Sequence, residues 1–137
     1  MSTIPSVQNQ TLVSTLDIEF VEQTKQRVVA RMPVGPKVHQ PFGILHGGAS
    51  VVLAETVAST GGWLNVDSSK ETVVGLEINA NHLRAKRDGM VTAVATPLHI
   101  GRKTHVWEIK ITDEQDKMVC ISRCTLAVVP LMRSAQP

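Results

Sequence analysis

The chain has 137 residues, 42% hydrophobic and 19% charged, a composition that excludes general disorder and fits one globular domain. Its 14 basic and 12 acidic side chains leave a net charge of only +2, which argues against a nucleic-acid-binding face built on a concentrated basic stripe. The aromatic residues, two Phe and two Trp, are too few for a base-stacking platform.

The first half of the chain is predicted to hold two strands and one helix. Residues 1–14 are polar and are expected to form a flexible segment. Apolar and polar residues then alternate over 16–20 and 28–32, which is the pattern of half-buried strands. Prolines between 33 and 41 force an extended connection, and an apolar run from about His46 to Leu64 predicts a helix.

Four further strands are predicted after the helix, because alternating segments are separated by short polar connections that are typical of hairpins. They cover about Val73–Arg84, Met90–His99, Thr104–Thr112 and Met118–Pro130. The predicted order is β-β-α-β-β-β-β in a single α+β domain over 15–130, followed by a tail at 131–137. Because the one helix is apolar nearly all round, a curved antiparallel sheet of about six strands must wrap it.

Two cysteines, Cys120 and Cys124, fall on the last predicted strand, where four residues separate the Cα atoms by about 13 Å. That distance is too long for a disulfide, so we expect two reduced thiols in a cytoplasmic protein. No secretory leader is recognisable at the N-terminus, and no apolar segment approaches the ~20 residues of a membrane span.

One glutamate, Glu55, interrupts the apolar helix. An ionised carboxylate removed from water costs stability unless it is compensated, so a sequence keeps one chiefly where chemistry requires it. Ser59 and Gly62 share its helical face, and Ser59 can hydrogen-bond the carboxylate or a water molecule beside it. The alternative is a structural carboxylate that Ser59 and a backbone amide satisfy, or one that faces solvent.

Gly47 and Gly48 directly precede the apolar run. First-turn amides lack intrahelical partners and can stabilise negative charge on a carbonyl oxygen, as in an oxyanion hole. A tight turn with no further role is the alternative. On a straight helix Gly47 and Glu55 lie about 12 Å apart, too far to hold one carbonyl group together. If both act on one substrate, the amide belongs to a second subunit, and the pairing predicts a two-fold dimer.

Two segments resemble the hotdog-fold acyl-CoA thioesterases. They are Gln40-Pro-Phe-Gly-Ile-Leu-His-Gly-Gly-Ala-Ser-Val-Val-Leu-Ala-Glu55 and Val-Val-Gly-Leu-Glu-Ile-Asn-Ala-Asn-His82. The resemblance spans about residues 16–129 and is strongest to a bacterial branch that acts on aryl- and related acyl-thioesters. That branch includes the 1,4-dihydroxy-2-naphthoyl-CoA thioesterases and the enterobactin-proofreading thioesterases. It implies the hotdog fold, in agreement with the predicted element order.

The resemblance also implies roles for individual residues. Glu55 would be the catalytic carboxylate, attacking the thioester or activating water, and the Gly47 amide would polarise the thioester carbonyl. Gln40 and His46 would orient the substrate, although His46 alternatively only caps the helix, and Ser59 would position water or the carboxylate. The residues expected near the CoA nucleotide are His82, Arg84, Gly101 and Arg102.

Two departures from relatives leave the acyl preference open. Thr60 is polar where relatives often carry an aliphatic or small residue, and the loop that follows the helix is one residue longer than in some of them.

Basic residues in two turns form either a solvated edge or a site for the 3′-phospho-ADP part of CoA. They are Arg84, Lys86, Arg87, Arg102 and Lys103.

The expected partner is an acyl-CoA substrate, with no nucleic acid and no membrane. The five histidines show no metal-ligand spacing, so neither a metal nor another cofactor is expected. The resemblance implies a homo-oligomer, a dimer at least and, as a dimer of dimers, a tetramer.

Together these features predict a thioester hydrolase, an acyl-CoA thioesterase that uses Glu55 as nucleophile or general base and helix N-terminal amides as an oxyanion hole. Its substrate would be an aryl- or medium-sized acyl-CoA, such as 1,4-dihydroxy-2-naphthoyl-CoA. The alternatives are a non-catalytic acyl-CoA-binding module, a thioesterase for acyl-carrier-protein thioesters, and a hotdog dehydratase, which needs a different His-acid arrangement.

Overall fold

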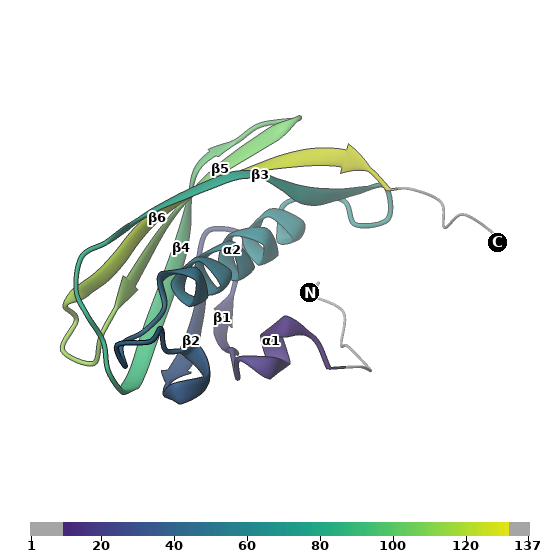
Figure 1. The fold of residues 1–137 in the computed structure, drawn as a ribbon. Helices are drawn as coiled ribbons and strands as arrows, with labels where there is room; N and C mark the ends of the chain where they lie inside the picture. Colours follow the sequence, from purple (N-terminus) through teal and green to yellow (C-terminus); the bar gives the residue numbers. More distant parts are fainter. Residues whose placement is uncertain (1–9, 132–137) are drawn as a thin grey trace.

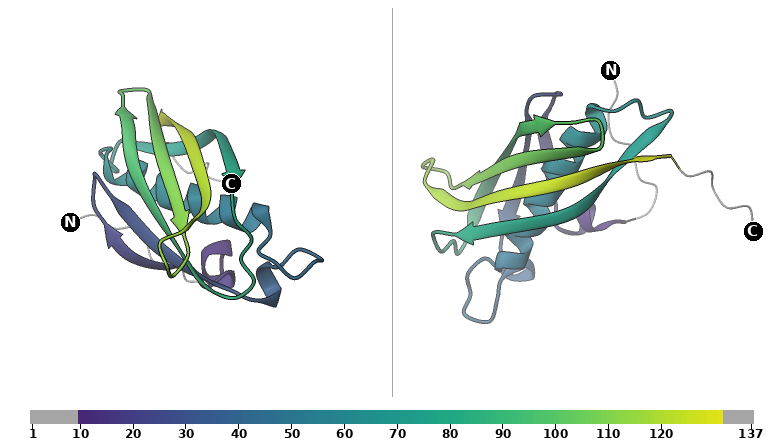
Figure 2. Two further views of the ribbon diagram at one scale, coloured as in Figure 1. Left: turned by 90° about the vertical axis from the view of Figure 1, so that its left-hand side faces the viewer. Right: turned by 90° about the horizontal axis from the view of Figure 1, so that it is seen from above.

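The computed structural model describes residues 10–131, in which one long helix lies against a six-stranded antiparallel sheet (Figure 1). The sheet curves around the helix, α2 (Gly47–Leu64), which therefore lies along its concave face (Figures 1 and 2). The strands are β1 (Glu19–Gln23), β2 (Val28–Val34), β3 (Glu71–His82), β4 (Gly89–Ile100), β5 (Thr104–Thr112) and β6 (Met118–Pro130). The predicted fold class and element order are confirmed.

The strands follow one another across the sheet in the order β1-β2-β4-β5-β6-β3. β4, β5 and β6 are joined by hairpins, as their short polar connections predicted. The hairpin expected between the third and fourth strands, through residues 86–89, is wrong: β3 precedes β4 in sequence but pairs with β6, with Ile78 opposite Cys124. One edge of β3 therefore has no neighbouring strand in the described part of the chain, and its outward backbone groups are free to pair.

The core lies between α2 and the concave face of the sheet. Leu53 and Val57 of the helix are fully buried there, and so are Trp107 and Ile109 of β5. Burial of each such side chain contributes about 1.5–3 kcal/mol. Gly61 allows the helix to approach the sheet closely, because a Cβ at this position would collide with the Trp107 indole.

A short helix, α1 (Leu12–Thr15), was not predicted. The Thr11 amide donates to Ser14 Oγ at 3.0 Å, and the Ser14 hydroxyl donates to the Thr11 carbonyl at 3.0 Å. A helix of four residues is too short to show helical periodicity, so its sequence only suggested a polar segment. A 3-10 turn, η1 (Pro36–Val38), occupies part of the proline-rich connection.

The N-terminal boundary also differs from the prediction. β1 begins at Glu19, and Leu16, which was expected to start the strand, instead packs with Val13 against the core. The remainder of the expected flexible segment, residues 1–9, and most of the expected tail, residues 132–137, lie outside the described residues.

Cys120 and Cys124 lie on β6 as expected, and both are buried free thiols. Burial, followed by the charges of Glu55 and Glu77, raises the pKa of Cys124 to about 12. This thiol therefore stays protonated and is a poor nucleophile. Among the helices of residues 10–131, none is long and apolar enough to cross a membrane.

Candidate active site

The N-terminus of α2 is capped by its own preceding residue. The amide of Gly48 donates to Nδ1 of His46 at 2.8 Å, and the extended backbone of His46 is typical of an N-cap residue. His46 thus caps the helix, and its expected role in orienting the substrate stays a prediction. The Gly47 amide, by contrast, makes no hydrogen bond within residues 10–131, so it is the amide of this first turn that remains free for a ligand.

The end of β3 lies against this helix terminus. A Cβ built on Gly47 would come within 2.8 Å of Nε2 of His82, so the imidazole packs directly on the glycine. His82 is itself exposed. The structure therefore brings His82 beside the free amide rather than leaving it on a remote part of the sheet.

Glu55 lies two turns further along α2 and is half-buried rather than fully shielded from solvent as the sequence suggested. Its carboxylate makes no hydrogen bond or ion pair among the described residues. It rests on β3 at Gly75, where a Cβ would collide with the carboxylate oxygen. The absence of a side chain at this strand position therefore creates the space that the carboxylate occupies.

A pocket of about 370 Å³ opens beside Glu55. Its lining residues come from α1 and α2 and are Leu12, Val13, Val52, Glu55, Thr56, Ser59 and Thr60. The hydroxyls of Thr56 and Thr60 donate to the carbonyls of Val52 and Thr56 at 2.7 and 2.8 Å. Ser59 makes no such bond in the described chain, so the lining residues with polar side-chain groups left to bind a ligand are Glu55 and Ser59.

Gly62 does not share this pocket, although it was expected on the face of Glu55. It is buried, and a Cβ there would collide with Leu126 and come within 3.3 Å of Nδ1 of His105. The glycine allows the helix to pack closely on the sheet. The helical spacing that places Glu55 and Ser59 together is confirmed, whereas Gly62, which also faces β3, packs on Val73 and Leu126 and leaves no space beside the carboxylate.

Gln40 lies in the loop that leads into α2. Its side-chain oxygen accepts a hydrogen bond from the backbone amide of Phe42. The backbone amide of Gln40 donates to the Ile44 carbonyl at 2.8 Å. These bonds fold residues 40–44 into a compact loop whose end enters the helix cap at His46. Gln40 is thus fixed within the loop that precedes the helix N-terminus.

The residues expected near the CoA nucleotide fall into two groups. On the β3–β6 ladder, His82 lies opposite Cys120. The Gly101–Arg102 turn leads into β5 at Thr104, which lies opposite Ala127 of β6, and Ala127 in turn lies opposite Val74 of β3. Val74 and His82 are eight residues apart on β3, or about 26 Å. Within one subunit, His82 and Arg84 therefore lie at the opposite end of the sheet from Gly101 and Arg102.

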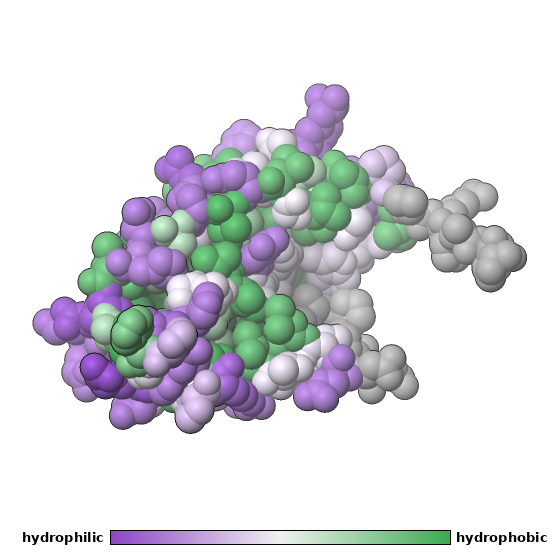
Figure 3. Space-filling model, in the orientation of Figure 1, coloured by the Kyte–Doolittle hydropathy of each residue, from purple (hydrophilic) through white to green (hydrophobic). Residues whose placement is uncertain are grey.

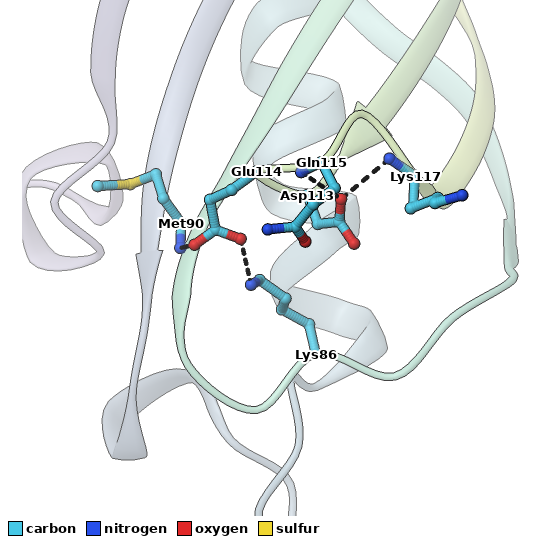
Figure 4. Close-up of polar contacts among 6 residues, drawn as sticks. All are labelled: Lys86, Met90, Asp113, Glu114, Gln115 and Lys117. Atoms are coloured by element: carbon cyan, nitrogen blue, oxygen red, sulfur yellow. Dashed lines mark hydrogen bonds and ion pairs between the residues drawn. The ribbon is translucent and has the colours of Figure 1, made fainter.

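The connection between β3 and β4 is fastened to the β5–β6 hairpin (Figure 4). The Lys86 ammonium pairs with the carboxylate of Glu114, which also accepts the Met90 amide at 2.8 Å. In the same hairpin, Asp113 accepts the amides of Gln115 and Lys117, each at 2.9 Å. Lys86, which the sequence grouped with the basic cluster, is thus already paired and serves to hold this connection.

Sequence reasoning missed several residues of the site, namely Leu12, Val13, Val52 and Thr56 of the pocket wall and Gly75. A signal existed for Gly75, because a glycine inside a strand pattern often marks close approach of another group. None existed for Leu12 and Val13, whose contribution depends on the unpredicted α1. In residues 10–131, no three His, Cys, Asp or Glu side chains gather so as to hold a metal ion.

Most of the chain is similar to known proteins. A family model described as "Thioesterase superfamily" matches residues 42–120. The 1,4-dihydroxy-2-naphthoyl-CoA hydrolase of Listeria monocytogenes is 57% identical over 117 residues, covering 85% of this chain and 94% of that protein. A thioesterase from Pseudomonas aeruginosa, crystallised with a glutamine-to-alanine substitution, is 51% identical, with a TM-score of 0.86 over 88% of this chain and 87% of that chain.

A Staphylococcus aureus protein has been solved as two variants. The glutamate-to-alanine variant is 45% identical, with a TM-score of 0.86 over 88% of this chain and 100% of that chain. The glutamine-to-alanine variant is 44% identical, with a TM-score of 0.85 over 87% of this chain and 98% of that chain. The two substituted positions are separated by the same number of residues as Gln40 and Glu55.

Proposed function

Since the chain belongs to the thioesterase superfamily and is a thioester hydrolase of the hotdog fold, we propose that it hydrolyses acyl-CoA thioesters with an aromatic or medium-sized acyl group. The observation that carries this proposal is the unpaired Glu55 carboxylate at the wall of an apolar pocket. The substrate named for the Listeria relative, 1,4-dihydroxy-2-naphthoyl-CoA, is a specific candidate.

Glu55 supplies the reacting carboxylate. As a general base it takes a proton from water while the water oxygen attacks the thioester carbon, the C–S bond breaks and CoA leaves as its thiol. As a nucleophile its oxygen forms a mixed anhydride and expels CoA thiolate, and water then hydrolyses the anhydride. Ser59, one turn along the helix and without an internal hydrogen bond, is placed to orient water or the carboxylate.

The Gly47 amide stabilises the oxyanion, but not in the subunit that supplies the carboxylate. Both residues lie on α2, about 12 Å apart, and a single carbonyl cannot contact both. We therefore propose that each site combines Glu55 of one subunit with the partner subunit's Gly47, which requires a two-fold dimer.

The open edge of β3 supplies a surface for this dimer. Glu55 rests beside Gly75 and Gly47 rests beside His82. If two β3 edges pair antiparallel about a two-fold axis near Ile78 and Asn79, Gly75 of one subunit comes opposite the end of the partner's strand. The carboxylate then faces the partner's helix terminus, as the mechanism requires. A tetramer, formed as a dimer of such dimers, remains a prediction.

The same pairing supports a site for the CoA nucleotide. It brings the end of β3 that bears His82 and Arg84 toward the partner's opposite end, where its own Gly101–Arg102 turn lies. Arg84 and Arg102 are exposed and make no ion pair among the described residues. They are therefore available to the phosphates of 3′-phospho-ADP.

Gln40 is proposed to orient the substrate beside the oxyanion site. Its loop leads directly into the helix cap, and this connection supports a position for Gln40 beside the oxyanion site. The spacing of the two positions substituted in the Staphylococcus aureus protein matches the spacing of Gln40 and Glu55, which supports their assignment to one site.

The test is thiol release from a panel of aryl- and alkanoyl-CoA esters, with the corresponding acyl-carrier-protein thioesters beside them. The wild-type protein should release CoA, and Glu55→Gln should lower kcat by about 10²–10⁴-fold. Binding of a non-hydrolysable acyl-CoA thioether should remain near normal, because the change keeps the size of the side chain.

Glu108→Gln is the matched control, since Glu108 is a half-buried carboxylate on β5 that pairs with Lys110 at 3.8 Å, does not line the pocket and lies away from the β3 edge. Near-normal turnover by Glu55→Gln would refute the assignment. Tight binding of CoA esters without thiol release by the wild-type protein would instead identify an acyl-CoA-binding module, and formation of a carbon–carbon double bond would identify a dehydratase.

A further inference from the structure

We infer that α1 is a wall of the acyl-binding pocket and that Leu12 is a specificity-determining residue of this thioesterase. The inference rests on the proposed function, because it assigns the pocket beside Glu55 to the acyl group of the substrate. It adds a segment outside the central helix and sheet to the site.

The pocket lies between α1 and α2, and both helices contribute lining residues. Leu12 and Val13 of α1 line it on one side, and α2 lines it on the other. On the face of the molecule shown in Figure 3, apolar surface (green) runs across the middle, between hydrophilic regions (purple). An acyl group that enters here has its carbonyl end beside Glu55 and its apolar end against α1.

Leu12 and Val13 differ in what they do for the fold. Val13 is partly buried against the core, and its carbonyl accepts the Ile18 amide at 3.0 Å. Leu12 is 54% exposed, so it adds little to the core. A large apolar side chain that remains half in solvent while lining a pocket has a ligand as its natural contact.

α1 is held firmly enough to act as a wall. The Thr11 and Ser14 hydrogen bonds cap its start, and the Leu16 amide closes its last turn on the Leu12 carbonyl at 3.0 Å. These bonds fix the backbone turn that carries Leu12, and the packing of Val13 and Leu16 on the core holds that turn against the fold.

The chemistry of the pocket selects a compact apolar group. The hydroxyls of Thr56 and Thr60 are engaged within α2, so they do not demand a polar ligand. The volume of about 370 Å³ is at the low end of the roughly 300–1,000 Å³ of small-molecule sites. An aromatic or short branched acyl group fits this description better than a long alkyl chain.

The experiment compares Leu12→Ala with Val21→Ala, a matched control that removes a similarly exposed apolar side chain from β1, outside the pocket. Kinetics are measured with acetyl-CoA, benzoyl-CoA and 1-naphthoyl-CoA. Leu12→Ala should raise KM for the two aromatic esters about 10-fold, the effect expected of a lost apolar contact, and leave acetyl-CoA nearly unchanged. Val21→Ala should alter neither, and both variants should unfold near the wild-type temperature.

Leu12→Trp gives the opposite test, since the larger side chain should fill the pocket and shift preference toward acetyl-CoA. Equal effects of Leu12→Ala on all three esters, or no effect on any, would overturn the inference while leaving the hydrolase activity intact. Failure of the wild-type protein to hydrolyse any CoA ester would instead overturn the proposed function.

Discussion

Among single residues, His46 decides how the start of α2 can be used. Its imidazole takes the Gly48 amide and leaves the Gly47 amide free. The proposed oxyanion site therefore depends on the backbone N–H of Gly47, and most substitutions at this position would keep that N–H. Only a residue without an N–H group can remove the donor.

Gly47→Pro provides that change. Proline is accepted at the first position of a helix, and the extended His46 backbone suits a residue that precedes proline. We expect kcat to fall about 10²–10³-fold, the usual cost of one lost oxyanion donor. The control is Gly47→Ala, which also places a Cβ against His82 but keeps the N–H group. Equal turnover by the two variants, measured as thiol release, would exclude the Gly47 amide from the reaction.

The sequence predicted the site well where one residue carried an unusual cost or geometry. Glu55 could be found because a carboxylate within an apolar run needs a reason, and His46 because it directly precedes the helix. The degree to which Glu55 is buried could not be predicted, since the space around its carboxylate depends on Gly75, which lies on another element. Leu12 was not predicted because its role exists only once α1 and α2 meet.

Among the elements, α2 and β5 were predicted almost to the residue, because the first is continuously apolar and the second alternates strictly. The ends of β3 and β4 were each displaced by one or two residues from their expected positions, as hydrogen bonding rather than hydropathy determines where a strand ends. The hairpin predicted after β3 was wrong, because the short polar connection at 86–89 joins two strands that are not neighbours in the sheet, and hairpin signals cannot reveal that β3 pairs with β6.

The Lys86–Glu114 contact should make the attachment of the β3–β4 connection pH-dependent. The Lys86 hydrogen bond, with the backbone amides of Glu114 and Met90, lowers the pKa of Glu114 from 4.5 to about 2. Because the folded-state pKa lies below the unfolded value, the ionised carboxylate stabilises the fold above pH 4.5. That stabilisation is lost as the pH falls from 4.5 toward 2.

Urea unfolding of wild-type and Glu114→Gln proteins at several pH values checks this. The wild-type protein should be the more stable of the two near pH 7, and the difference should shrink steadily as the pH falls from 4.5 toward 2. Glu22→Gln, which removes an exposed pair with Arg27, is the control and should have a smaller effect at neutral pH. A difference that stays constant with pH would show that Glu114 acts through its shape and not its charge.

For the whole molecule, the proposed division of each site between two subunits predicts complementation. A Glu55→Ala subunit keeps the Gly47 amide, and a Gly47→Pro subunit keeps the carboxylate. A dimer of one of each has one complete site, so mixing the two inactive proteins after unfolding and refolding should restore about a quarter of wild-type activity.

That fraction follows because half of randomly formed dimers are mixed and each mixed dimer has one of two sites intact. Native mass spectrometry, run beside the thiol-release assay, separates the mixed dimer from the two homodimers by mass and establishes that mixed dimers have formed. If mixed dimers form but activity does not return, Glu55 of one subunit and Gly47 of the other do not act at one site, and the proposal of a site shared between subunits is wrong.

Gly75 leaves a notch in β3 that the acid of α2 fills. Enlarging this strand residue would displace the acid from its resting place without altering any chemical group that meets the ester. The residue at position 75 thus controls how well the Glu55 carboxylate is positioned. A larger side chain there is expected to give a protein that binds the ester without hydrolysing it.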